Sequence, residues 1–296
     1  MSGPIRSVLI TGAGGNLGSK LIAHLRVQGW CERIVALDRR LPALTGGEPE
    51  QVEWVSGNLA DLSNWNWQDA FAGVDAVVHF AAQNPYPDAS WTDACASFDM
   101  TLNMLAAAAR AKARRVVFAS SNHVMGQYKD PPLAETLAPG GLTTILPPGP
   151  GTTWFNGRSM VQGVAYATSK LMGERACLAE AQRSGGALTS VCIRIGWCQP
   201  GENDPRTINT SGLPGEAGGQ GPDAERDLRW FRSMWLSNRD FVAIFERALL
   251  ADAAPWPGPG IVVNGMSANR GMPWDIETTR RMIGHEAQDN AWDHLA

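Results

Sequence analysis

The first half of the chain alternates short β-branched runs with longer amphipathic stretches, and no other feature limits its possible folds as strongly. The short runs predict strands, and the amphipathic stretches predict helices. This alternation is typical of α/β proteins, in which helices cover both faces of a parallel sheet. The expected strands are Ser7–Thr11, Arg33–Asp38, Val52–Ser56, Ala76–Phe80, Arg115–Ser120, Ser190–Ile195 and Gly260–Asn264. The expected helices are Asn16–Gln28, Trp91–Ala111 and Val164–Arg183.

Two segments interrupt the alternation. Asp130–Gly157 is rich in Pro and Gly, and Thr207–Glu225 is rich in Gly and acidic residues. Both follow late strands, whose carboxyl ends face the ligand crevice of an open α/β sheet. Because long irregular connections are usually functional, we expect two lid-like insertions over a substrate pocket, with surface decoration as the alternative. We expect residues 1–196 to form a doubly wound core that binds the cofactor. Residues 197–296 are expected to form a small substrate-binding part with the last strand.

The composition excludes several classes of protein. The net charge is −4 and no basic cluster is present, which argues against nucleic-acid binding. No apolar run reaches the ~20 residues of a membrane-spanning helix. The five cysteines lack CxxC spacing, so neither a disulfide framework nor a zinc site is expected. The N-terminus lacks a signal-peptide core, so we expect a cytoplasmic protein. Of the twelve tryptophans, we expect most in the core and some against a sugar-like ligand.

A glycine-rich turn joins the first expected strand to the first expected helix. Gly12, Gly15 and Gly18 allow a tight turn, and backbone N–H groups at the helix N-terminus can bind a pyrophosphate. Asp38 ends the second strand, where a carboxylate can accept both ribose hydroxyls of an adenosine and would repel a 2′-phosphate. The two arginines after it could tolerate that phosphate. The pattern predicts NAD in preference to NADP, and a purely structural turn is the alternative.

Two further strand ends are expected beside the cofactor. Asp61 follows the third strand, where its carboxylate can accept the adenine amino group while Leu62 offers its backbone N–H; on its own, Asp61 would be a helix cap. Ala81 follows the fourth strand, and small residues there let the chain pass close to the cofactor. His79 is expected to be a buried core histidine. The predicted cofactor-binding residues are Gly12, Gly15, Asn16, Leu17, Gly18, Asp38, Asp61, Leu62, Ala81 and Lys170.

The segment Tyr166-Ala167-Thr168-Ser169-Lys170 carries the strongest chemical signal. It lies in an expected helix, where positions i and i+4 share one face. A lysine ammonium beside a phenol favours the phenolate and lowers the pKa of the tyrosine. A phenolate can take a proton from an alcohol while a hydride leaves the carbon. An aromatic–lysine pair on a helix surface is the alternative for the motif standing alone.

Polar side chains follow the fifth expected strand. The Ser121 hydroxyl can hydrogen-bond the reacting oxygen and orient it toward Tyr166, and Ser120 is the rival for this role. Asn122 and His123 are expected to contact the substrate. No second histidine lies at ligand spacing from His123, so no metal site is expected.

With these motifs the chain resembles the extended short-chain dehydrogenases/reductases of the NAD-dependent epimerase/dehydratase superfamily, from about Val8 to Asn269. Within that superfamily it is most similar to the uronate dehydrogenases. This narrower similarity rests on Ser120–His123, Arg194–Cys198 and Trp235–Phe241. The resemblance implies a Rossmann-type fold and oxidation of the anomeric carbon of an acidic hexose to its lactone, with reduction of NAD.

The resemblance also implies roles for individual residues. Tyr166 is expected to be the general base, and Lys170 its electrostatic partner and the anchor of the cofactor ribose. The full set of predicted substrate contacts is Asn84, Ser121, Asn122, His123, Trp197 and Arg206.

Three departures from the family pattern concern the substrate. Trp197 stands where the family usually has a small serine that contacts substrate, and Asn84 stands where it uses a small hydroxyl residue. The arginine that binds the substrate carboxylate falls at Arg206 if no gap intervenes, and at Arg229 or Arg232 otherwise. Because a cation suits a carboxylate, a sulfonate or a phosphate about equally, a sulfonated hexose such as sulfoquinovose is an alternative substrate.

Two other functions remain open at this stage. A nucleotide-sugar epimerase or dehydratase uses the same cofactor scaffold, but dehydratases need an acid pair where this chain has Asn122 and His123. Only about a hundred residues follow Ile195, which is short for a nucleotide-sugar domain. A non-catalytic NAD sensor would not need the tyrosine, lysine and serine together. Homo-oligomers are common in the superfamily, and we expect a dimer or larger assembly packed through the helices at 91–111 and 164–183.

Overall fold

Seven parallel strands form the central sheet of the computed structural model, which describes residues 3–42, 50–61, 63, 65–212 and 218–295. The strand order is β3-β2-β1-β4-β5-β8-β9, so the direction of winding reverses between β1 and β4. This confirms the predicted doubly wound, Rossmann-type fold. The strands are β1 (Ser7–Thr11), β2 (Arg33–Asp38), β3 (Val52–Ser56), β4 (Ala76–His79), β5 (Arg115–Ser121), β8 (Thr189–Ile195) and β9 (Gly260–Gly265).

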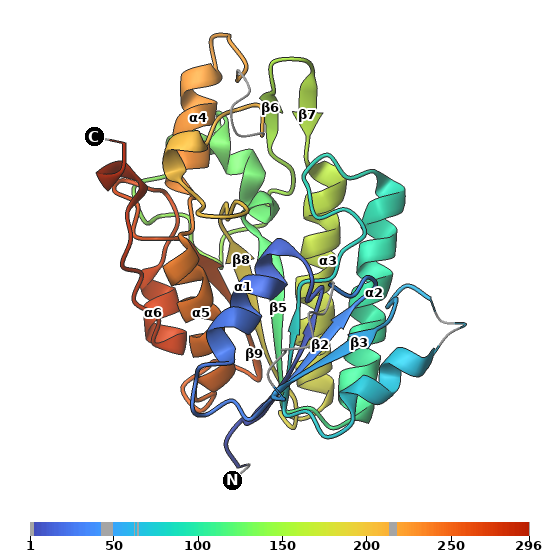
Figure 1. The fold of residues 1–296 in the computed structure, drawn as a ribbon. Helices are drawn as coiled ribbons and strands as arrows, with labels where there is room; N and C mark the ends of the chain where they lie inside the picture. Colours follow the sequence, from blue (N-terminus) through green and yellow to red (C-terminus); the bar gives the residue numbers. More distant parts are fainter. Residues whose placement is uncertain (1–2, 43–49, 62, 64, 213–217, 296) are drawn as a thin grey trace.

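Helices cover both faces of this sheet, as Figure 1 shows. Helices α1 (Asn16–Leu25) and α5 (Asn238–Leu250) pack on one face, and α2 (Trp91–Arg110) and α3 (Val164–Arg183) pack on the other. Helix α1 ends three residues earlier than the predicted Gln28. Its last turn tightens there, because the N–H groups of residues 27 and 28 bond to carbonyls three residues back.

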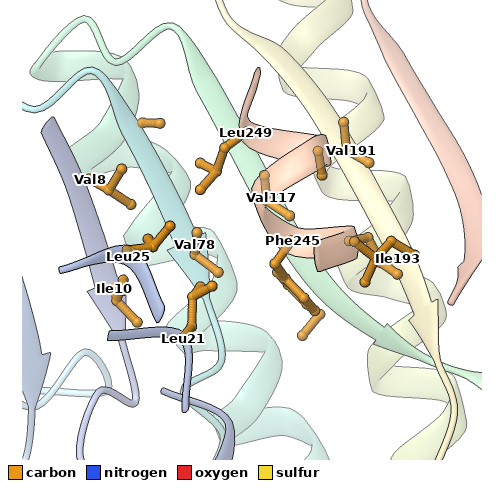
Figure 2. Close-up of a cluster of buried hydrophobic side chains, with 14 of the residues drawn as sticks. Val8, Ile10, Leu21, Leu25, Val78, Val117, Val191, Ile193, Phe245 and Leu249 are labelled. Atoms are coloured by element: carbon orange, nitrogen blue, oxygen red, sulfur yellow. The ribbon is translucent and has the colours of Figure 1, made fainter. Parts of the chain in front are cut away.

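The core on the α1 side is built from β-branched strand residues and larger helical ones (Figure 2). Val8, Ile10, Val78, Val117, Val191 and Ile193 come from the strands. Leu21 and Leu25 come from α1, and Phe245 and Leu249 come from α5. All ten side chains are fully buried, and strand residues of the opposite face, such as Leu9 and Val77, are buried as well. The strands therefore read as continuous apolar runs rather than as alternating ones.

The segment at 130–157 is not as irregular as its Pro and Gly content predicts. It contains a short 3₁₀ helix, η3 (Leu133–Thr136), and the first strand of a hairpin formed by β6 (Thr153–Phe155) and β7 (Met160–Gln162). The described part of 207–225 leads into helix α4 (Ala224–Ser233). In Figure 1 this hairpin and α4 stand together beyond one end of the sheet.

A third apolar cluster holds this end of the molecule together. It includes Trp154 of β6, Phe231 of α4, and Met266 and Trp274 near the C-terminus. Residues on both sides of position 196 therefore share one cluster. The division into 1–196 and 197–296 stays a prediction. The C-terminal region also contains α6 (Glu277–Ile283).

Helices α2 and α3 expose several apolar side chains on their outer face, including Trp91, Leu102 and Met172. The predicted homo-oligomer would use these two helices, and it stays a prediction. Within the described ranges, every helix is too short or too polar to cross a membrane.

Candidate active site

A cavity of about 510 Å³ opens at the carboxyl ends of β1, β2, β4, β5 and β8. This is the edge at which an open α/β sheet binds its ligand. The cavity brings together twelve of the residues predicted from sequence: Gly12, Gly15, Asn16, Leu17, Asp38, Ala81, Ser121, Asn122, His123, Tyr166, Lys170 and Trp197. Gly18, Asp61, Asn84 and Arg206 are not among the lining residues, and Leu62 lies outside the described residues.

The glycine turn is built for close approach of backbone to backbone. Gly12 has a φ of +67°, and a Cβ atom on it would lie 2.9 Å from the backbone nitrogen of Ala81. A Cβ on Gly18 would lie 2.4 Å from the Gly12 carbonyl oxygen. Gly18 therefore allows helix α1 to pack closely against the turn, and it does not line the cavity. Gly15 caps α1 without a side-chain hydrogen bond, which leaves the helix N-terminus open to an anion. These residues fit the pyrophosphate of a dinucleotide.

Asp38 sits at the end of β2, where the ribose of such a cofactor is expected. Its Oδ2 accepts a hydrogen bond from the Gly14 N–H at 2.9 Å, and its Oδ1 accepts one from the Arg40 N–H at 3.1 Å. Asp61 is used differently, because its Oδ1 accepts from the Ser63 N–H at 2.9 Å in a local turn. Asn58 and Leu59 line the cavity instead.

Tyr166 and Lys170 lie one turn apart on the buried face of α3. The Lys170 ammonium donates to the Ala119 carbonyl oxygen at 2.8 Å and lies 5.8 Å from the centre of the Tyr166 ring. Burial lowers the pKa of Lys170 to about 8. Burial also raises the pKa of Tyr166, and a hydrogen bond with the Ser121 side chain only partly offsets this. The predicted lowering of the tyrosine pKa is therefore wrong for the protein alone, because loss of water costs the phenolate more than its neighbours return.

The structure separates the two candidate serines. Ser121 lines the cavity, whereas Ser120 points to the other face of β5 and donates to Glu174 Oε1 at 2.6 Å. Arg194 holds the same carboxylate through two hydrogen bonds of 2.8 and 2.9 Å. This pair is almost completely buried, with side chains 2% and 1% exposed. It fixes α3 to β5 and β8.

Sequence reasoning did not assign this ion pair. The signal was present in the spacing, because Tyr166, Lys170 and Glu174 follow one another at intervals of four residues and so share one helix face. His79 is a buried core residue, as predicted, and its Nδ1 lies 2.7 Å from Thr11 Oγ1.

The two polar residues after β5 are both held by the protein. Asn122 Nδ2 donates to the Ile195 carbonyl oxygen at 3.0 Å, and its Oδ1 has no partner in the part of the chain that the structure describes. His123 Nδ1 lies 2.7 Å from Thr152 Oγ1. Burial lowers the pKa of His123 to about 4, so the ring is neutral near pH 7.

Aromatic and sulfur side chains from the 130–157 insertion and from the helix that follows the 207–225 insertion complete the far end of the cavity. Trp154 comes from β6, and Phe231 and Met234 come from α4 and its end. The Trp154 indole N–H donates to the Thr210 carbonyl oxygen at 2.9 Å, which joins the two insertions. Sequence reasoning missed these three residues, because nothing local marks a residue that reaches the cavity only through tertiary packing.

Two predicted substrate contacts lie elsewhere. Arg206 has a side chain that is 70% exposed and forms an ion pair with Asp204 at 2.6 Å. Counting without a gap placed it at the site, but the 3₁₀ turn at Pro205–Thr207 directs it outward. Asn84 accepts from the Tyr86 N–H at 3.1 Å in a turn, and the cavity is lined by residues 85–87 instead.

Comparison with known proteins decides the family. The model of the NAD dependent epimerase/dehydratase family matches residues 8–196, which is more than half of the chain. The chain belongs to this family. The match spans the glycine turn, Ser121, Tyr166 and Lys170. It therefore confirms the predicted superfamily and NAD as the cofactor, and the chain is an NAD-dependent oxidoreductase of that family.

Curated relatives cover nearly the whole chain. An L-arabinose 1-dehydrogenase (NAD(P)(+)) of Haloferax volcanii is 30% identical, over 96% of this chain and 97% of that protein. A uronate dehydrogenase of Pseudomonas syringae pv. tomato is 28% identical, over 92% of this chain and 78% of that protein. A solved structure of a mutated uronate dehydrogenase superposes with a TM-score of 0.69 at 25% identity, over 98% of this chain and 84% of that chain.

Proposed function

We propose that the chain oxidises the anomeric carbon of a sugar to the lactone and passes the hydride to NAD. The observation that carries this proposal is that Ser121, Tyr166 and Lys170 share one cavity with the glycine turn. The relatives support it, because two enzymes that cover most of the chain act on sugars, one on L-arabinose and one on uronates.

Each of the three side chains has a distinct part in this chemistry. Tyr166 takes the proton from the anomeric hydroxyl, and Ser121 donates a hydrogen bond to the same oxygen. The C1–H bond breaks with both electrons leaving as hydride, and the C1–O bond becomes the lactone carbonyl. NAD, when bound, supplies the acceptor for that hydride. Proton and hydride together account for the two hydrogens that the sugar loses.

Lys170 makes the base usable. Its pKa of about 8 leaves it largely protonated near pH 7, so a positive charge lies beside the phenol. The ammonium is held by the Ala119 carbonyl and stabilises the phenolate as it forms. Lys170 also lines the cavity, which places it to anchor the cofactor ribose.

The predicted acidic hexose depended on a cation at the substrate end. Arg206 is turned outward, and neither Arg229 nor Arg232 lines the cavity. The proposal is therefore made for sugars in general, oxidised at C1, and it does not require an acid group on the substrate. A nucleotide-sugar epimerase on the same scaffold would retain its cofactor, so net release of NADH separates the two functions.

The experiment compares two matched tyrosine variants. Tyr166→Phe removes the proposed base. Tyr128→Phe removes another buried hydroxyl, which donates to the Pro147 carbonyl and does not line the cavity. We expect Tyr166→Phe to lower kcat for NADH formation about 100-fold or more, with NAD affinity unchanged. We expect Tyr128→Phe to stay within about threefold of the parent. Equal rates for the parent and Tyr166→Phe would contradict the assigned base.

A further inference from the structure

A continuous series of rings lines the cavity from the proposed base to its far end. The His123 ring lies 5.8 Å from the Tyr166 ring and 6.2 Å from the Trp154 ring, between ring centres. Phe231 continues the series, 5.3 Å from Trp154 and 5.2 Å from Trp197. All five residues line the cavity. We call this series the ring wall.

The two cations of the described cavity lining lie at the cofactor end and at the Tyr166 end of the ring wall, where the Lys170 ammonium is 5.8 Å from the centre of the Tyr166 ring. Among the described lining residues, Arg39 and Lys170 are the cationic ones. Arg39 follows Asp38 at the cofactor end, and Lys170 donates to the Ala119 carbonyl beneath the proposed base. The residues outside the described part include no lysine or arginine, so they add no cation to the site.

The other lysines and arginines nearby do not line the cavity. Lys20 contacts the lining residue Cys198, but its ammonium donates to the Gln199 carbonyl at 2.6 Å and to Asn238 Oδ1 at 2.7 Å. Arg229 is exposed on α4, and Arg232 is half-buried outside the lining, with an Nε that has no partner among the described residues. His123 is neutral near pH 7, because burial lowers its pKa to about 4.

These surroundings favour an uncharged ligand. Aromatic faces carry negative electrostatic potential, so they attract C–H groups and repel carboxylates. A carboxylate brought against the ring wall would lose its water without gaining a cation.

We propose that the substrate is an uncharged aldose, a pentose or a 6-deoxyhexose, that lays a C–H-rich face on the ring wall. The inference rests on the proposed oxidation at C1. It narrows the substrate class from sugars in general to neutral sugars with an apolar face, and it excludes the uronates, sulfonated hexoses and sugar phosphates.

A matched substrate series tests this inference. L-Arabinose, D-fucose, D-galactose and D-galacturonate share one ring configuration and differ at C5 by hydrogen, methyl, hydroxymethyl and carboxylate. We expect kcat/KM with NAD to be highest for arabinose or fucose and lower by about tenfold or more for galacturonate. Galacturonate is also expected to inhibit fucose oxidation only at concentrations far above the fucose KM.

The outcomes separate this inference from the proposed function. Galacturonate turned over as well as fucose, or inhibiting below the fucose KM, would overturn the neutral-substrate inference and leave the oxidation at C1 standing. If no sugar of this series or of the corresponding gluco series yields NADH while NAD still binds, both proposals are wrong.

A pair of variants tests the missing cation directly. Phe231→Arg introduces a positive charge into the ring wall, and Phe231→Leu is its uncharged control. We expect the galacturonate/fucose ratio of kcat/KM to rise about tenfold or more in Phe231→Arg and to change less than about threefold in Phe231→Leu. If the parent enzyme already prefers galacturonate to fucose, the neutral-substrate inference is wrong. This result does not depend on whether Phe231→Arg folds.

Discussion

The two ends of the cavity are built in different ways. The cofactor end consists mostly of backbone and small residues that directly follow strands of the sheet, such as Gly12 and Gly15 after β1 and Ala81 after β4. The substrate end consists of large side chains, Trp154, Trp197 and Phe231, delivered by segments far apart in the chain. One end is thus specified by short motifs and the other by packing.

The difference explains where substrate specificity can change. The glycine turn leaves no room for a side chain, because a Cβ on Gly18 would collide with backbone. Apart from Tyr166 of α3, the ring wall comes from β6, α4 and the residues after β5 and β8, and these segments meet through tertiary contacts such as the Trp154–Thr210 hydrogen bond and the Arg226–Asp130 ion pair. We infer that the family's cofactor chemistry is retained while the substrate end is free to vary.

After the loss expected for Tyr166→Phe, the largest effect is expected at the cofactor end. Asp38→Ala removes the only carboxylate among the described lining residues, and with it the expected acceptor for the ribose hydroxyls. Loss of hydrogen bonds to a charged group is expected to raise the KM for NAD about 10- to 100-fold. The KM for NADP is expected to change far less, and it serves as the internal control. An equal rise for both cofactors would indicate a general folding defect.

A pH profile of kcat tests the assignment of Tyr166 as the general base. Because burial raises the pKa of Tyr166, the phenolate is a minor species near neutral pH, and its fraction grows about tenfold per pH unit. Oxidation needs the phenolate and the charged Lys170, whose pKa is about 8, so kcat is expected to rise between about pH 6 and 8 and to level off above pH 8. Reduction of the lactone needs the phenol and is expected to stay flat over that range. A flat oxidation profile, measured with saturating NAD, would contradict this assignment.

The smallest expected effect is at Arg206. Its side chain is 70% exposed and paired with Asp204, outside the cavity. Arg206→Ala is expected to change kcat/KM for neutral sugars and for uronates less than about twofold. A larger loss, specific to uronates, would restore the arginine to the role that the sequence predicted.

Sequence reasoning succeeded where local physics determines the structure. Strand β1 and helix α3 were predicted with the bounds observed, because a short β-branched run is typical of a buried strand and a long run of good helix formers is typical of a helix. The YxxxK spacing placed Tyr166 and Lys170 on one face because positions i and i+4 lie one helical turn apart. At Ser120 and Ser121 the alternation of side chains along β5 decides which hydroxyl reaches the cavity, and the strand register was not available beforehand.

Sequence reasoning failed where a residue reaches the site through tertiary packing. Trp154 lies in a hairpin that the Pro- and Gly-rich composition concealed, and Phe231 lies in a helix that was not predicted. The pKa of Tyr166 depends on how deeply the side chain is buried, and the spacing of residues along the sequence does not reveal that burial. Arg206 was assigned by counting along the chain, and a short turn was enough to move it outside.

The most direct test of the account follows the hydrogen that leaves the sugar. Oxidation of C1-deuterated L-arabinose with NAD is expected to give NADH that carries one deuterium per molecule, detected by mass spectrometry, together with the lactone. Deuterium-free NADH, or deuterium retained in the sugar product, would show that the anomeric carbon is not the site of oxidation and would contradict the proposed function.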